Sequence, residues 1–133
     1  MEEQETKKRI ILIVEDDTFL SDMYQTKFLS AGYDVHIALD GDQCLSKLKE
    51  GLRPDVILLD VVMPHMSGRE LDERLTASRP QLKVLYMSGY ADALIRHQGL
   101  LKPGLAYLQK PFTPEILTQK VRELLDRMTT AFT

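Results

Sequence analysis

The sequence Val56-Ile57-Leu58-Leu59-Asp60 places one carboxylate directly after four consecutive apolar residues. An unbroken apolar run of this length is typical of a strand that is buried on both faces of a parallel sheet. Pro54 stands just before the run and disfavours a helix through it. The pattern therefore predicts a central β-strand over 56–59, with Asp60 at its carboxyl end.

Three other apolar runs also end on a polar and chemically reactive residue. They are Ile10–Val14 before Glu15, Asp16 and Asp17, then Val84–Met87 before Ser88, and Ala106–Gln109 before Lys110. The carboxyl ends of parallel strands share one edge of a sheet, and ligands bind at this edge in open α/β folds. We therefore expect the acids, the hydroxyl and the ammonium group to gather at one edge of a sheet.

Helical patterns separate the predicted strands. A further strand is predicted over 33–38, and one of the helices is expected around 92–101. The last helix has a clear start, because Thr113 can cap it and Pro114 suits its first position. Strand and helix alternate five times, which predicts an α/β fold with a doubly wound parallel sheet and helices on both faces.

Length and composition describe one ordinary domain. The chain has 133 residues, 44% hydrophobic content, a net charge of −3 and a single cysteine. It has no apolar run of the roughly 18 residues that a membrane span needs, and its first residues lack an apolar signal core. We expect a cytoplasmic domain over 9–128 with flexible tails at 1–8 and 129–133, and no nucleic-acid or membrane partner.

The acids at the predicted edge suit a divalent cation and a phosphoryl group. Asp60 can act as a nucleophile toward phosphorus, although an isolated aspartate there is also typical of a turn or a helix cap. The adjacent acids at 15–17 repel one another, and Mg²⁺ would offset that repulsion; a solvated acidic turn is the alternative. Because strand residues alternate faces, only one of these acids should join Asp60 directly. We assign direct metal contact to Asp16, water-mediated contact to Glu15, and capping of the next helix to Asp17.

Ser88 and Lys110 could serve the same phosphoryl group. A hydroxyl can donate a hydrogen bond to one phosphoryl oxygen and an ammonium group can pair with another. Either residue alone would be an ordinary surface group, and their place at apolar strand ends is what distinguishes them. The Lys110–Pro111 bond is of the type that can adopt cis, which would turn the lysine inward, although trans is commoner.

Taken together, the motifs resemble the receiver domain of two-component response regulators. The matching segments are Ile11–Asp17, Asp55–Asp60, Met63-Pro64 with Gly68, and Lys110-Pro111-Phe112. The resemblance implies a flavodoxin-like sheet of five strands in the order 2-1-3-4-5. It also implies that the domain takes a phosphoryl group from a histidine kinase or a histidine phosphotransfer domain and then changes conformation.

The resemblance implies roles for the residues that match the family pattern. Asp60 corresponds to the phospho-acceptor and Asp16 to the direct Mg²⁺ ligand, with Glu15 beside it. Val62 would offer its backbone carbonyl to the same ion.

Three further residues correspond to the family's switch and phosphate-binding groups. Ser88 resembles the switch hydroxyl, and Lys110 resembles the lysine that pairs with the phosphoryl group. Tyr107 matches the switch aromatic residue, which turns inward when the hydroxyl engages the phosphoryl group. The alternative is that Tyr107 is an ordinary half-buried core tyrosine, and the two roles are compatible.

The segments Met87–Ala91 and Leu108–Thr113 look most like receivers at the C-terminus of hybrid sensor histidine kinases. Two interpretations stay open: a stand-alone receiver, or a domain that is covalently linked to a kinase core. In receivers, the fourth helix commonly forms the surface that passes on the signal. Gly89 and Pro103-Gly104 lie on either side of the corresponding segment here and predict that this helix is short or mobile.

Two other functions are alternatives to that of a signalling receiver. A phosphohydrolase of the haloacid-dehalogenase type needs a second acid two residues after the nucleophile, and Val62 stands there. A degenerate receiver that only binds proteins would not need the acids, Ser88 and Lys110. We therefore expect no enzymatic activity beyond Mg²⁺-dependent self-phosphorylation and slow self-dephosphorylation.

Overall fold

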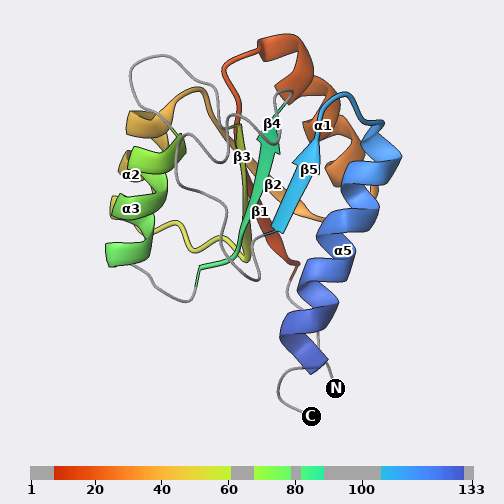
Figure 1. Ribbon diagram of the computed structural model, residues 1–133. Coiled ribbons are helices and arrows are strands. Elements are labelled where there is room, and N and C mark those ends of the chain that lie inside the picture. Colours follow the sequence, from red (N-terminus) through yellow and green to blue (C-terminus); the bar gives the residue numbers. More distant parts are fainter. Residues whose placement is uncertain (1–7, 61–67, 79–81, 89–105, 131–133) are drawn as a thin grey trace.

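The computed structural model describes residues 8–60, 68–78, 82–88 and 106–130 (Figure 1). Strands and helices alternate along these segments. They are β1 Ile10–Val14, α1 Thr18–Ser30, β2 Asp34–Ala38, α2 Gly41–Lys49, β3 Val56–Asp60, α3 Gly68–Ser78, β4 Val84–Ser88, β5 Ala106–Gln109 and α5 Pro114–Thr130. The helix that was predicted over 92–101 lies outside the described residues.

The strands form one five-stranded sheet in the order β2-β1-β3-β4-β5, and every neighbouring pair is parallel. The register aligns Val14 with Leu59 and Ser88 with Gln109, so the carboxyl ends of the strands meet at one edge. The predicted fold class and strand order are confirmed.

Helices cover both faces of the sheet, with α1 and α5 on one side and α2 and α3 on the other (Figure 1). The inner strands β1 and β3 are buried on both faces, as their continuous apolar runs predicted. Leu12, Val14, Ile57 and Leu59 pack in the cluster shared with α2 and α3. Their neighbours along β1 and β3 pack in the cluster shared with α1 and α5. Two cores therefore hold the strand ends in place.

Helix α1 begins directly after Asp17, as the predicted cap requires. The Asp17 side chain accepts a hydrogen bond from the Leu20 backbone N–H at 3.2 Å, which caps the helix. Gly32 follows the helix with a positive φ of 96°, a conformation that costs glycine little. Tyr24 and Phe28 are buried along the inner face.

Helix α5 starts at Pro114, and the Thr113 hydroxyl accepts a hydrogen bond from the Ile116 backbone N–H at 3.1 Å. An ion pair of 3.4 Å joins Glu115 to Lys27 on α1. The helix continues to Thr130, so the first two residues of the predicted tail 129–133 are helical. Neither proline nor glycine interrupts the chain there, and the backbone hydrogen bonds can continue.

Two strands extend one residue beyond their predicted ends. Asp60 aligns with Met87 on the neighbouring strand, and Ser88 aligns with Gln109, so both polar residues belong to the ladder. Ladder pairing depends on the backbone rather than on side-chain polarity, which explains the difference. Within the described segments, no helix combines the length and the apolar character that crossing a membrane requires.

Candidate functional site

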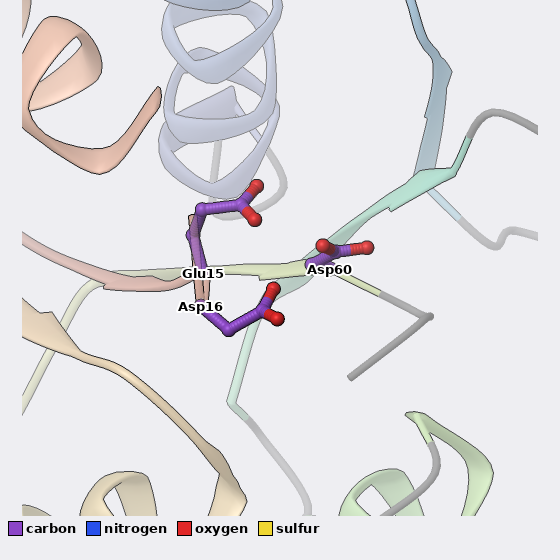
Figure 2. Close-up of side chains that lie close together, drawn as sticks. All are labelled: Glu15, Asp16 and Asp60. Atoms are coloured by element: carbon purple, nitrogen blue, oxygen red, sulfur yellow. The ribbon is translucent and has the colours of Figure 1, made fainter. Parts of the chain in front are cut away.

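Three carboxylates meet at the carboxyl edge of the sheet. Glu15 and Asp16 directly follow β1, and Asp60 ends β3; one oxygen from each lies within 4.8 Å of the others. Figure 2 shows the Glu15 and Asp16 side chains leaving the chain in different directions, with both carboxylate groups turned toward the side where Asp60 lies. Glu15 is 1% exposed and Asp60 is 6% exposed, whereas Asp16 is open to solvent.

The structure corrects one expectation about this cluster. Alternation of strand faces predicted that only one of the adjacent acids would approach Asp60, yet both Glu15 and Asp16 do so. The two side chains do leave the chain in different directions, as alternation predicts, and the Glu15 backbone N–H still donates to Ala38 on β2 at 3.1 Å. Each carboxylate group is nevertheless turned toward β3, so both come close to Asp60.

Lys110 supplies a positive charge to the cluster from the far end of the sequence. Its ammonium group donates to Glu15 Oε1 at 3.0 Å and lies 3.4 Å from Asp60 Oδ2. The lysine follows β5, and the Lys110–Pro111 peptide bond is cis. The second oxygen of Glu15 accepts a hydrogen bond from the Asp17 backbone N–H at 3.2 Å. Both oxygens of Glu15 are therefore engaged by protein groups.

The electrostatics of Glu15 and Lys110 reflect this crowding. Burial and the nearby charge of Asp60 raise the pKa of Glu15 to about 7, although Lys110 acts in the opposite direction. Burial alone would lower the pKa of Lys110, but its hydrogen bond to Glu15 and the charge of Asp60 raise it. The lysine stays charged at neutral pH, while the buried glutamate is costly to ionise.

The donor set fits a hard divalent cation. The cluster offers three carboxylates and holds one ammonium group, so a surplus of negative charge remains when all the acids are ionised. Mg²⁺ prefers one or two carboxylates and keeps several waters. Asp16 and Asp60 are suited to direct contact, and Glu15, whose oxygens are already engaged, is suited to contact through water.

The remaining predicted site residues are placed only in part. Ser88 ends β4 at the same edge, but its side chain lies outside the described residues, as does Val62. Tyr107 is half-buried on β5 and packs against the core cluster that faces α2 and α3. Its inward turn upon phosphorylation stays a prediction.

One neighbour of the site was not assigned a functional role from the sequence. Tyr24 on α1 stacks on Phe112, with ring centroids 5.7 Å apart and an angle of 26° between the planes. Burial raises the pKa of Tyr24 to about 12, and the charges of Lys110, Glu15 and Asp60 also act on its hydroxyl. The helical spacing of Leu20, Tyr24 and Phe28 indicates that Tyr24 faces the core, but it carries no signal for a partner so distant along the chain.

Most of the chain also matches a known protein family. Residues 11–122 match the family model of the response regulator receiver domain. The chain belongs to the response-regulator receiver family. Proteins of this family work in two-component signalling, where they receive phosphoryl groups from histidine kinases and bind Mg²⁺ at an acidic pocket.

Individual relatives support the same assignment. The DNA-binding response regulator MtrA of Mycobacterium tuberculosis (strain ATCC 25618 / H37Rv) is 32% identical over 123 residues, which are 92% of this chain and 53% of MtrA. This receiver thus spans about half the length of the curated relatives it matches.

Two solved structures extend the comparison to the fold. A CheY-like receiver domain protein from Methanospirillum hungatei JF-1 has a TM-score of 0.84 and 33% identity, covering 94% of this chain and 99% of its own. The receiver domain of the hybrid histidine kinase CckA has a TM-score of 0.73 and 26% identity, covering 87% and 98%. The predicted receiver family is confirmed, whereas the predicted likeness to hybrid-kinase receivers in particular stays a prediction.

Proposed function

We propose that this receiver takes a phosphoryl group onto Asp60, with Mg²⁺ held by Asp16, Asp60 and the Val62 backbone carbonyl, and with Glu15 contacting the ion through water. The observation that carries the proposal is the position of Asp60. Its carboxylate lies in the acidic cluster and is also 3.4 Å from the Lys110 ammonium group. A phosphoryl group on Asp60 would thus have a cation-binding cluster beside it and a fixed ammonium group within reach.

The chemistry is a transfer between nitrogen and oxygen. An Asp60 oxygen attacks phosphorus, the phosphorus–nitrogen bond of a phosphohistidine breaks, and the departing imidazole keeps the bonding electrons and takes up a proton. Lys110 pairs with a phosphoryl oxygen and stabilises the negative charge on that oxygen during the transfer. Mg²⁺ supplies neutralisation of the remaining charge on the phosphoryl oxygens when it is bound.

The switch would follow from the new phosphoryl group. The Ser88 hydroxyl would donate a hydrogen bond to a phosphoryl oxygen, which would draw Ser88 toward Asp60. The Tyr107 ring would then turn into the space that this movement opens. A ligand shifts such an equilibrium only through contacts that differ between the two states. Ser88 ends the strand next to the one that carries Asp60, which supports the pairing.

The donor that we propose is a histidine kinase or a histidine phosphotransfer domain. A covalently linked kinase core is compatible with the likeness to the receiver of the hybrid histidine kinase CckA. A net charge of −3 supports a domain that makes no direct contact with nucleic acid or with a membrane surface. A reducing, cytoplasmic setting suits the buried free thiol of Cys44, which forms no disulfide.

We also propose that the aspartyl phosphate hydrolyses slowly. Hydrolysis needs a water placed in line with the phosphorus–oxygen bond. In receivers, the side chains two positions after the acceptor and two positions after the switch hydroxyl border that approach, and these positions hold Val62 and Tyr90 here. Valine cannot hold a water by a hydrogen bond, and tyrosine is bulky. Val62→Asn and Tyr90→Ala should both shorten the lifetime of the phosphorylated protein. A longer lifetime in Tyr90→Ala would instead mean that the tyrosine assists the water.

Labelling with acetyl phosphate tests the acceptor. The protein with Mg²⁺ should gain one phosphoryl group in its intact mass, and should gain none when the metal is removed by a chelator. Asp60→Asn should abolish labelling, whereas Asp42→Asn, at an exposed position on α2, should label like the parent. Equal labelling of Asp60→Asn and the parent would show that the acceptor has been misassigned. Sustained turnover of a small phosphoester would instead favour a phosphohydrolase.

A further inference from the structure

The stack between Tyr24 and Phe112 joins the helix that follows the acidic residues to the turn that carries Lys110. Phe112 lies two residues after Lys110, in the turn between β5 and α5, and is half-buried. Tyr24 is 3% exposed on α1, the helix that follows the acidic residues. The ring pair therefore fastens the turn that carries the lysine to the helix that starts at the acids.

The neighbourhood of Tyr24 includes the lysine itself. The charge of Lys110 acts on the pKa of Tyr24, and Tyr24 acts in turn on the pKa of Lys110. The Lys110 side chain has a flexible stem, and its ammonium group must stay between Glu15 and Asp60 to pair with a phosphoryl oxygen. When the turn that carries Lys110 is held in place, less conformational entropy is lost in keeping the ammonium group between Glu15 and Asp60.

We propose that Tyr24 is a positioning residue for phosphoryl transfer: its ring, stacked on Phe112, holds the turn that aims Lys110 at the acidic cluster. This inference rests on the proposed function of Asp60 and Lys110. The tyrosine touches no reacting atom in this arrangement and acts through the lysine. The ring rather than the hydroxyl carries the effect, because the stack is the contact that reaches the turn.

Two measurements test the proposal. The first is the rate of phosphorylation by acetyl phosphate at saturating Mg²⁺. The second is the rate at which an amine-reactive ester acylates Lys110 in metal-free protein, measured by mass spectrometry with the exposed Lys49 as internal reference. Tyr24→Leu should slow phosphorylation and speed Lys110 acylation, each by roughly twofold to tenfold, which corresponds to the usual strength of an aromatic pair.

Matched variants separate positioning from simple loss of core packing. Phe28 lies one turn further along the same face of α1, is fully buried, and its ring pairs with that of Tyr33. Phe28→Leu should lower stability and leave both rates near those of the parent. Tyr24→Phe keeps the ring and should keep both rates within about twofold of the parent. If Tyr24→Leu fails to fold, Phe112→Leu removes the same stack from its half-buried side and should show the same two changes.

A double-mutant cycle with the lysine gives the sharpest outcome. In a Lys110→Ala background, Tyr24→Leu should cause no further loss of phosphorylation rate, because the group that it positions is gone. Equal effects of Tyr24→Leu in both backgrounds, or an unchanged acylation rate of Lys110, would overturn the proposal. If the parent protein accepts no phosphoryl group at all, the proposed function fails, while the acylation measurement still decides whether Tyr24 holds Lys110.

Discussion

Replacing Glu15 by glutamine should change how the stability of the metal-free protein depends on pH. The pKa of this buried carboxyl group is raised from its ordinary value of 4.5 to about 7, first by burial and then by the charge of Asp60. Between these two pH values the folded protein holds a proton that the unfolded chain releases. The contribution of Glu15 to the free energy of unfolding therefore falls as the pH rises through this window, and it changes little above about pH 7.

The size of the effect follows from the shift in pKa. Each pKa unit corresponds to about 1.4 kcal/mol, so the contribution of Glu15 is on the order of 3 kcal/mol at most. Glutamine keeps the shape and can keep one oxygen toward Lys110, but it cannot ionise. Its NH₂ group then faces the Asp17 backbone N–H, and this cost is the same at both pH values. The Glu15→Gln variant should therefore gain roughly 1–3 kcal/mol relative to the parent when both are compared at about pH 8 instead of about pH 4.5.

Urea denaturation followed by circular dichroism measures this difference, with a chelator present at both pH values. Glu123→Gln, which removes an exposed carboxylate on α5, is the matched control and should show no comparable pH-dependent gain. Added Mg²⁺ should stabilise the parent at about pH 8, because the ion binds the folded state alone. A constant offset between Glu15→Gln and the parent across the window, or a loss at high pH, would refute the assignment of a strained buried carboxylate.

Three further perturbations test the metal site, the switch and the core. Asp16→Asn removes a charged oxygen that the acidic cluster offers to Mg²⁺ and should weaken Mg²⁺ binding by about tenfold or more in a calorimetric titration. Asp17→Asn, which can still cap α1, is its control, and a larger effect there would exchange the two roles. Ser88→Ala should leave phosphorylation possible but reduce the response of a fluorescent or NMR probe near Tyr107, and a full response would remove the serine from the switch. Phe28→Ala should lower the free energy of unfolding by about 3–5 kcal/mol in urea denaturation, since the ring is fully buried in the core shared by the sheet and α1; a cost under about 1 kcal/mol would contradict that packing.

The strands and their shared edge were predictable because their signals are local. A run of four or five apolar residues must be removed from water on all sides, and few structures allow this. Burial on both faces of a parallel sheet is one of them. The caps of α1 and α5 were equally readable, since Asp17 and Thr113 act within three residues of their own positions. Asp60 and Ser88 were predicted just beyond their strands because a polar residue suggests a strand end. The backbone pairing nevertheless continues through both residues.

The side-chain arrangement within the site was less predictable. Alternation along a strand suggested that only one of Glu15 and Asp16 would approach Asp60. The two side chains do leave the chain in different directions, but both carboxylates come close to Asp60. Glu15 was expected to contact a metal ion through water, and nothing local indicated that it would be buried and bonded to Lys110. A hydrogen bond between residues 95 positions apart depends on how the whole sheet is assembled.

By itself, the amino-acid sequence determined which residues reach the edge of the sheet and which chemical groups are available there. Apolar runs, turn residues and helix caps act over a few positions, so their consequences can be read along the chain. Only the tertiary structure decided which of those groups touch: that Lys110 bonds Glu15 more closely than Asp60, and that Tyr24 meets Phe112. These contacts follow from the packing of α1 against α5 and from the order of the strands, and packing at close range depends on the whole core rather than on any one segment.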